Sequence, residues 1–361
     1  MKPPTRRRFL KNAALAAAAG AAAPLYSFNI IHRPQLIGPI LGHGDFTYRL
    51  EQDWGKLDAS QTPVKDCHEM VQDAQGRLFL LTNHAKNNVI IYDASGKLLG
   101  SWTLQLKAAH GLSIHDEGGE QFLYITDTGS RGAVGKVLKT TLDGRVIMEL
   151  PNPRDLGVYR PDQAYKPTET AIGPKGDIYV ADGYGSQFVL QFNQQGEFIR
   201  KFGGDSFLRQ DAFKQAHGVT LDVRDPENPS LICTARIKCT LKRFSLEGEW
   251  LEDFYLPGAF MSRAVIHGDE LYTGVCFGMT PDNFNMQMNL GFVSILDKRN
   301  RVVSNPGGTP PIYKANGALE PLYQAEPIFK HCHDVCVDRD KNLYVCQWNA
   351  GKVYPYKLHR I

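Results

Sequence analysis

The chain has 361 residues, with 41 basic and 38 acidic side chains and a formal net charge of +3. Five of the basic residues and none of the acidic ones lie in the first 27 positions, so the remainder carries 36 basic against 38 acidic side chains. A nearly neutral chain of this kind lacks the basic surface that binds phosphates, and no nucleic-acid partner is expected.

The N-terminal segment has the pattern of an export signal. Thr5-Arg6-Arg7-Arg8-Phe9 is a twin-arginine motif, and an alanine-rich run follows over 13–23. Those eleven residues are fewer than the about 20 that a membrane-spanning helix needs. We therefore predict a twin-arginine signal peptide over 1–27 and a lead-in over 28–45. We also expect export by the twin-arginine machinery to the periplasm or the cell exterior, and no transmembrane segment in the mature chain.

From residue 46 onwards a strand–turn–strand pattern recurs. Turn-and-strand segments lie at 75–80, 175–180 and 341–345, and second tight turns at 93–97, 143–145, 193–197 and 245–249. Glycine-containing turns between alternating strands predict β-hairpins. Two hairpins in each unit make one four-stranded propeller blade. The sequence thus predicts an all-β fold, with residues 46–361 forming a single six-bladed β-propeller of four-stranded antiparallel blades.

Six units begin at equivalent positions, which are His68, His110, Thr168, His217, Ser262 and His333. A blade needs about 40–50 residues, so the longer intervals predict insertions over 151–164 and 276–324. The second insertion is either a lid over a site or surface decoration. The last unit ends after its third strand near Leu358. Residues 47–50 are expected to supply its outer strand and close the ring from the N-terminus, which removes exposed sheet edges.

The seven cysteines show no CxxC spacing, so a thiolate zinc cluster is not expected. Their odd number leaves at least one unpaired. Cys67 and Cys332, which each precede a histidine, are expected to be buried thiols and not ligands.

Four histidines begin the innermost strands of predicted blades, so they should surround one mouth of the central channel. His110, His217 and His333 belong to alternate blades of a six-fold ring, and their side chains should converge from three directions. Three imidazoles with open positions towards solvent are typical of a catalytic zinc site. We predict zinc or another transition metal here. His68 is either a neighbouring channel residue or an additional ligand, although any single histidine is more often a simple channel residue.

Short motifs around these histidines resemble a known family. The motifs are Ala-His-Gly-Leu-Ser-Ile at 109–114, Ala-Asp-Gly-Tyr at 181–184, Ala-His-Gly-Val at 216–219 and His-Asp-Val at 333–335. They resemble the signature positions of peptidyl-α-hydroxyglycine α-amidating lyase, a family of NHL-repeat propellers, over about residues 66–358. The resemblance implies a six-bladed propeller with a zinc ion and a structural calcium ion. It also implies cleavage of a C-terminal α-hydroxyglycine into a peptide amide and glyoxylate.

The resemblance assigns roles to individual residues. His110, His217 and His333 match the zinc ligands, Tyr184 matches the proposed base and Arg236 matches an active-site arginine. Asp334 and the backbone carbonyl of Leu112 fall at the calcium positions. Zinc lowers the pKa of a bound hydroxyl group, and a tyrosine whose pKa is depressed by metal and arginine then removes its proton. Arginine holds a carboxylate through two parallel hydrogen bonds.

The chain departs from the family at three positions, and the first departure bears on the substrate. A second family arginine falls at Asn83-His84, where this chain has none nearby. A family methionine is replaced by His331, a further channel candidate able to alter coordination, and a family cysteine is replaced by Gly185.

Three functions remain open on the sequence. The first is a metal-dependent lyase similar to the amidating lyases, acting on a small hydroxylated or carboxylate-bearing molecule or a peptide. The second is a non-catalytic NHL propeller that binds protein, peptide or glycan. The third is a calcium-dependent lactonase-type hydrolase using Glu169 and Asp334. The histidines favour the first, because a binding module has no use for them and calcium prefers oxygen donors.

Overall fold

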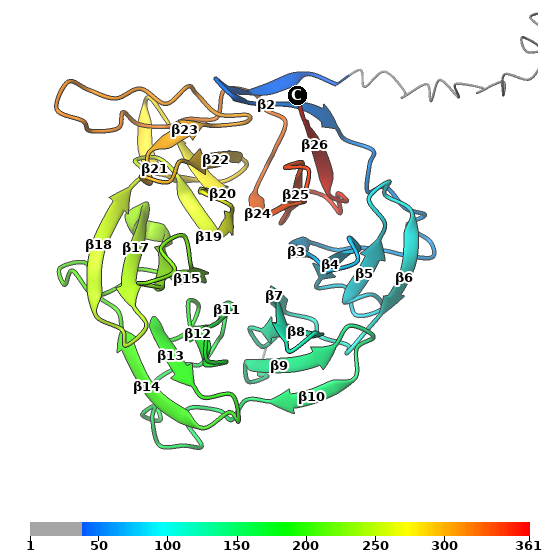
Figure 1. The fold of residues 1–361 in the computed structure, drawn as a ribbon, viewed down its shortest axis with the longest axis vertical. Helices are drawn as coiled ribbons and strands as arrows, with labels where there is room; N and C mark the ends of the chain where they lie inside the picture. Colours follow the sequence, from blue (N-terminus) through cyan, green and yellow to red (C-terminus); the bar gives the residue numbers. More distant parts are fainter. Residues whose placement is uncertain (1–37, 131) are drawn as a thin grey trace, which may run out of the picture. The chain divides into compact units, whose positions relative to one another are not determined.

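The computed structural model describes residues 38–130 and 132–361. In this part of the chain six antiparallel sheets surround a central channel (Figure 1), and the innermost strands of the sheets are β3, β7, β11, β15, β19 and β24. The prediction of an all-β, six-bladed propeller is confirmed. The predicted signal peptide and most of the lead-in lie outside the described residues.

The first three blades have four strands each. Blade 1 consists of β3 (Cys67–Gln72), β4 (Leu78–Thr82), β5 (Val89–Tyr92) and β6 (Leu98–Trp102). Blade 2 consists of β7 (Ala109–Glu117), β8 (Glu120–Asp127), β9 (Lys136–Thr141) and β10 (Val146–Glu149). Blade 3 consists of β11 (Glu169–Ile172), β12 (Ile178–Ala181), β13 (Phe188–Phe192) and β14 (Phe198–Gly203).

The other three blades complete the ring. Blade 4 consists of β15 (Ala216–Asp222), β16 (Ser230–Ala235), β17 (Thr240–Ser245) and β18 (Trp250–Tyr255), with a 3₁₀ turn over Arg236–Lys238. Blade 5 consists of β19 (Phe260–His267), β20 (Glu270–Thr280), β22 (Phe292–Leu296) and β23 (Val302–Ser304), with β21 (Asn283–Gln287) paired to β20. Blade 6 consists of β24 (Cys332–Val337), β25 (Leu343–Gln347), β26 (Tyr356–Arg360), β2 (Phe46–Glu51) and β1 (Ile40–His43).

The hairpin turns follow from local residue chemistry. In blade 1 the Asp73 side chain accepts a hydrogen bond from the backbone N–H of Arg77, and Gly76 has φ 84°. Aspartate stabilises such turns through its own backbone contacts, and glycine adopts positive φ without a steric cost. Buried apolar side chains then pack between neighbouring blades; Tyr272 and Val293 of blade 5, for example, lie in one cluster with Val335 and Val345 of blade 6.

Ring closure occurs as expected from the sequence. β2 pairs antiparallel with β26, so that Tyr48 faces Arg360 and Leu50 faces Leu358. β1, which falls within the predicted lead-in, adds a fifth strand outside β2. The last blade is therefore built from both ends of the described chain, and this closure protects the edge of β26.

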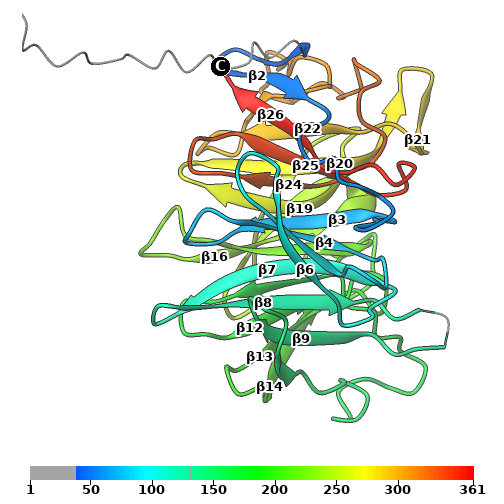
Figure 2. The same ribbon diagram turned by 90° about the vertical axis from the view of Figure 1, so that its right-hand side faces the viewer.

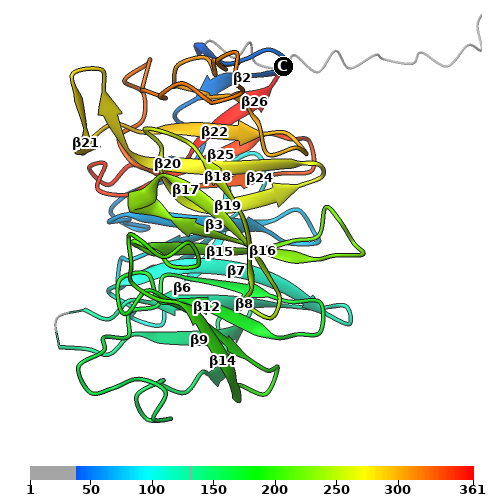
Figure 3. The same cartoon turned by 90° about the vertical axis from the view of Figure 1, so that its left-hand side faces the viewer.

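The predicted insertion over 276–324 was wrong in its extent. β20 continues to Thr280, and two ordinary blade strands, β22 and β23, lie inside the predicted range. The additional residues form two separate pieces, the β20–β21 hairpin and the connection between β23 and β24. Figures 2 and 3 show β21 projecting beyond the blades at one face of the ring.

All seven cysteines are buried free thiols. Cys67 and Cys332 lie in apolar clusters, as expected. Among the described residues no helix is long and apolar enough to span a bilayer.

Candidate metal centre and its surroundings

Four histidines lie together at one mouth of the channel. Each is the second residue of the innermost strand of its blade: His68 in β3, His110 in β7, His217 in β15 and His333 in β24. Each side chain is at most 4% exposed. The ring centroids of His110, His217 and His333 are 4.7–5.1 Å apart. His68 lies equally close to His110 and His333, at 5.0 and 4.7 Å. The repeat thus brings the three predicted ligands and His68 together.

The hydrogen bonds of two rings define their protonation. Nδ1 of His110 lies 2.9 Å from the carbonyl oxygen of Thr168, and Nδ1 of His333 lies 3.0 Å from that of His68. A carbonyl oxygen only accepts, so each Nδ1 carries the proton and each Nε2 of the neutral ring carries a lone pair. These two Nε2 atoms are 3.2 Å apart. Two lone pairs at this distance repel one another, and a cation that both nitrogens bind removes the repulsion.

The other two rings have nitrogens without protein partners. Among the described residues neither ring nitrogen of His68 has a hydrogen-bond partner, and the same holds for Nδ1 of His217. Buried polar atoms are rarely left unpaired. His68, His110 and His333 offer donor atoms that all lie within 4.8 Å of one another. His68, expected as the surplus member, therefore meets this distance requirement together with His110 and His333, whereas the predicted ligand His217 does not belong to the group.

Burial keeps all four rings neutral. It lowers the pKa of His68 to about 3, with Lys65 and Arg236 contributing. It also lowers the pKa values of His110, His217 and His333 well below the usual 6.5, with smaller contributions from neighbouring histidines and Arg236. Metal binding requires the neutral imidazole. The carbonyl bonds at Nδ1 are also the usual support of a metal-bound histidine. The cluster fits a transition metal.

Tyr184 and Arg236 complete this mouth. The Tyr184 hydroxyl lies 3.2 Å from Nε2 of His110 and 3.1 Å from Nε2 of His217. Nη1 of Arg236 lies 3.5 Å from the same oxygen. Although the Tyr184 side chain is 37% exposed, desolvation among the surrounding side chains raises the pKa of its hydroxyl group, and Arg236 acts in the opposite direction. The expected depression of this pKa is therefore not produced by the protein's own groups.

The loop before Tyr184 is held by a buried carboxylate. Asp182 accepts hydrogen bonds from the backbone N–H groups of Lys166 and Ser186 and from the Tyr159 hydroxyl. At Gly183 a Cβ atom would lie 2.3 Å from the carbonyl oxygen of Ala216, so only glycine fits. These contacts explain why an Asp-Gly-Tyr sequence carries the tyrosine into the histidine cluster.

Arg236 is buried without an acidic partner. It is 1% exposed and donates to the carbonyl oxygen of Met261 and the hydroxyl of Ser262, each at 2.8 Å. Among the described residues no carboxylate forms an ion pair with it. A buried charge normally has a counter-charge, so this guanidinium is available to an anionic ligand.

The mouth opens into a cavity of about 450 Å³. Besides the site residues its lining includes Lys65, Asn83, Lys107, Phe277, Met286 and Trp348. Met286 belongs to β21, so the β20–β21 hairpin reaches the site and is not mere surface decoration. The lysines and apolar side chains were missed by sequence reasoning, because they lie on loops between strands and follow no repeat.

His331 is excluded as a free ligand by its own hydrogen bonds. Its Nδ1 donates to the carbonyl oxygen of Trp348 at 3.0 Å, and its Nε2 accepts from the backbone N–H of Asn289 at 2.9 Å. The proposed change in metal coordination by His331 was therefore wrong. This side chain instead anchors the end of the β20–β21 hairpin.

The oxygens assigned to calcium are bound by an arginine. Nη1 of Arg263 donates to the carbonyl oxygen of Leu112 at 2.7 Å, and Arg263 also pairs with both carboxylate oxygens of Asp334. Glu169 lies in the same cluster, 3.6 Å from Arg263. Burial raises the pKa of Glu169, while Arg263 lowers it. A guanidinium thus occupies the position that the sequence assigned to a calcium ion.

The repeat contained a signal for this cluster. The residues that follow the six repeat positions are Glu69, Gly111, Glu169, Gly218, Arg263 and Asp334. Three acids and one base at one repeat position predict a charged layer beneath the histidines, and only Glu169 and Asp334 were recognised.

Comparisons with known proteins agree with this fold. No protein-family model matches the chain. Human NHL repeat-containing protein 3 is 25% identical over 209 residues, covering 54% of this chain and 60% of that protein. Drosophila melanogaster peptidyl-α-hydroxyglycine α-amidating lyase 1 is 26% identical over 291 residues, covering 74% and 48% respectively. The chain thus matches about half the length of these relatives.

Solved structures share the fold at low identity. A streptogramin B lyase has a TM-score of 0.51 at 15% identity, covering 86% of this chain and 97% of that one. A gluconolactonase from Xanthomonas campestris has a TM-score of 0.55 at 12% identity, covering 89% and 94%. The fold defines a six-bladed propeller with a polar channel. Its resemblance to the NHL-repeat propellers and the amidating lyases is confirmed by the curated relatives.

Proposed function

We propose that this chain is a metal-dependent lyase that converts a peptidyl-α-hydroxyglycine, or a close analogue, into an amide and glyoxylate. The observation that carries the proposal is the position of the Tyr184 hydroxyl. It lies within 3.2 Å of two neutral imidazoles and 3.5 Å from an unpaired, buried guanidinium. A binding propeller has no need of this combination. The lyase names of distant relatives support an enzymatic propeller.

The charges at the mouth support a carboxylate-bearing substrate. Arg236 offers a guanidinium to which a carboxylate can bind through two hydrogen bonds. Lys65 and Lys107 line the same cavity as Asn83, where the family's second arginine is missing. These lysines provide positive charge in its place. Phe277, Met286 and Trp348 provide an apolar wall for the peptide side of the substrate.

The proposed reaction breaks one carbon–nitrogen bond. Tyr184, as the phenolate, takes the proton of the substrate hydroxyl group, whose oxygen forms the aldehyde carbonyl of glyoxylate. The electrons of the breaking bond pass to the amide nitrogen, which takes up the proton from Tyr184 and leaves as the primary amide, so that the phenolate is regenerated. A transition metal held by the histidine cluster would supply the Lewis acidity that lowers the pKa of this hydroxyl. Arg236 keeps the carboxylate, and hence the reacting carbon, beside Tyr184.

The test is glyoxylate release from a short peptide ending in α-hydroxyglycine, incubated with zinc-loaded protein. We expect equal amounts of amide and glyoxylate, and none from the same peptide ending in glycine. Tyr184→Phe should keep its metal and lose roughly 10²–10⁴-fold in kcat. Folded, zinc-loaded protein that releases no glyoxylate would contradict the proposal and favour a binding propeller.

A further inference from the structure

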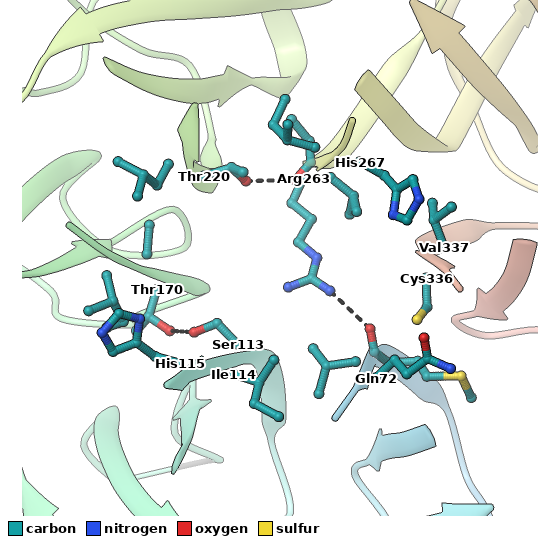
Figure 4. A pocket seen from close by; sticks show the side chains of 18 of the residues that line it. Gln72, Ser113, Ile114, His115, Thr170, Thr220, Arg263, His267, Cys336 and Val337 are labelled. Carbon is teal, nitrogen blue, oxygen red and sulfur yellow. Dashed lines mark hydrogen bonds between the residues drawn. The ribbon is translucent and has the colours of Figure 1, made fainter. Parts of the chain in front are cut away.

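The channel contains a second polar layer directly beneath the histidines. It is formed by Glu69, Glu169, Arg263 and Asp334, which follow the repeat positions of blades 1, 3, 5 and 6. All four side chains are buried. Figure 4 shows Arg263 reaching from β19 into the centre of the channel, opposite Ser113 and Thr170. We call these residues and the carbonyl groups of Met70 and Leu112 the oxygen cage.

The guanidinium contacts oxygen atoms of three other strands, β3, β7 and β24. Its Nε and Nη2 lie 2.8 and 2.9 Å from the two carboxylate oxygens of Asp334. Nη1 lies 2.7 Å from the carbonyl oxygen of Leu112 and 3.1 Å from Oε2 of Glu69. Nη2 lies 3.3 Å from the carbonyl oxygen of Met70. One side chain thus links blade 5 to blades 1, 2 and 6.

Carboxylate and carbonyl oxygens converging from several strands are the donors that a hard divalent cation such as Ca²⁺ prefers. We propose that Arg263 is a built-in cation that takes the place of such an ion. The propeller then needs no calcium, and removal of the guanidinium converts the oxygen cage into a calcium site. This inference does not depend on the proposed lyase activity.

The carboxylates are held in place independently of Arg263. Asp334 accepts a hydrogen bond from the backbone N–H of Met70, and Glu69 accepts one from that of Leu112. Glu169 accepts one from the N–H of Thr170, while its Oε2 has no hydrogen-bond partner among the described residues. The oxygen cage is therefore largely preformed, and Glu169 offers a spare donor atom.

An ion and the guanidinium exclude one another in this space. Arginine stays protonated in proteins, so it would repel a divalent cation among the same oxygens. Calcium also requires these oxygens at about 2.3–2.6 Å, while Arg263 holds them at hydrogen-bonding distance. Close packing fixes the arginine here, because a Cβ atom on Gly218 would lie 2.6 Å from the Cα atom of Arg263. A cavity of about 600 Å³ at the other mouth, lined in part by Arg263, gives a solute access to the cage.

The test compares wild-type protein with Arg263→Ala in calcium and in EGTA, by thermal unfolding and by calcium content. Wild-type protein should contain no calcium and show the same Tm in both buffers. Arg263→Ala should unfold at a lower temperature in EGTA and gain about 3 °C or more in millimolar calcium. The control is Arg243→Ala, since Arg243 is also paired with carboxylates but lies outside the cage. It should not respond to calcium.

Each result decides the proposal. About one calcium per wild-type chain, or a fall of its Tm in EGTA, overturns it. A folded Arg263→Ala variant that has the same Tm in calcium and in EGTA overturns it as well. If that variant does not fold in either buffer, Arg263→Lys replaces it, because lysine keeps the charge. Arg263→Lys should fold without calcium, and a calcium requirement in this variant also counts against the proposal.

Discussion

Two buried arginines, Arg263 and Arg236, lie at the same channel, and their surroundings differ. Arg263 lies among the carboxyl groups of Asp334, Glu69 and Glu169, which provide its counter-charge inside the protein. Arg236 contacts only neutral acceptors, a carbonyl group and two hydroxyl groups. A charge that is compensated inside the protein contributes to structure, whereas one that is not must be compensated by a ligand. On this comparison we assign a structural role to Arg263 and propose a substrate-binding role for Arg236.

The same contrast applies to the two layers of the channel. The histidine layer brings imidazole lone pairs together and has no positively charged side chain between them, since two Nε2 atoms lie only 3.2 Å apart. The oxygen cage collects negative oxygens and supplies its own cation. We therefore propose a metal ion in the first layer and none in the second.

The largest effect is expected for His110→Ala. This change removes an Nε2 atom that lies 3.2 Å both from Nε2 of His333 and from the Tyr184 hydroxyl. The variant should lose its transition metal and roughly 10³-fold or more of its lyase activity, since the Lewis acid is lost with it. The control is His359→Ala, because His359 pairs with Glu51 in the outer part of blade 6. Unchanged metal content in His110→Ala would argue against the histidine layer as the metal site.

Asp334→Asn tests the structural half of the comparison. It removes the bidentate carboxylate partner of Arg263 and places an amide NH₂, which is itself a donor, opposite one of the guanidinium N–H groups. Chemical denaturation should show a loss of about 3 kcal/mol in the free energy of unfolding. The transition-metal content should stay unchanged, because Asp334 does not contribute to the histidine layer. A neutral effect on stability would show that Arg263 does not hold the blades together.

Arg236→Met tests the ligand-binding half. The substitution keeps an apolar stem and removes the charge, so kcat/KM should fall about 100-fold, with little change in Tm. A substrate whose carboxylate is replaced by an amide should suffer a similar loss with wild-type protein and almost none with the variant. If the substitution and the amide substrate lower kcat/KM independently, so that the variant loses as much with this substrate as the wild type does, Arg236 does not bind the carboxylate.

The smallest effect is expected for Lys107→Ala. Lys107 lines the mouth and is exposed, and exposed charge pairs contribute about 1 kcal/mol or less. KM should rise about three-fold at low salt and approach the wild-type value at high salt, with kcat unchanged. If the KM of the variant equals the wild-type KM at every salt concentration, the substrate does not interact electrostatically with Lys107.

Much of this comparison was predictable from the sequence, because the propeller repeat maps sequence positions onto the channel. The repeat identified where each blade begins, the closing strand near residues 47–50 and the histidines that converge. It did not reveal the role of Arg263, because sequence position alone does not tell that a long side chain crosses the channel to oxygens of other blades. The limits of the second insertion were also missed. β22 is a short apolar strand among polar and methionine-rich segments, and β20 is longer than an ordinary blade strand.

The most direct test of the account is the metal content of purified wild-type protein, measured for transition metals and calcium in the same sample after exposure to both. The account predicts about one transition-metal ion and no calcium ion per chain. Two ions per chain, one of them calcium, would contradict the role of Arg263. A chain without a transition metal would contradict the metal centre, and with it the proposed lyase.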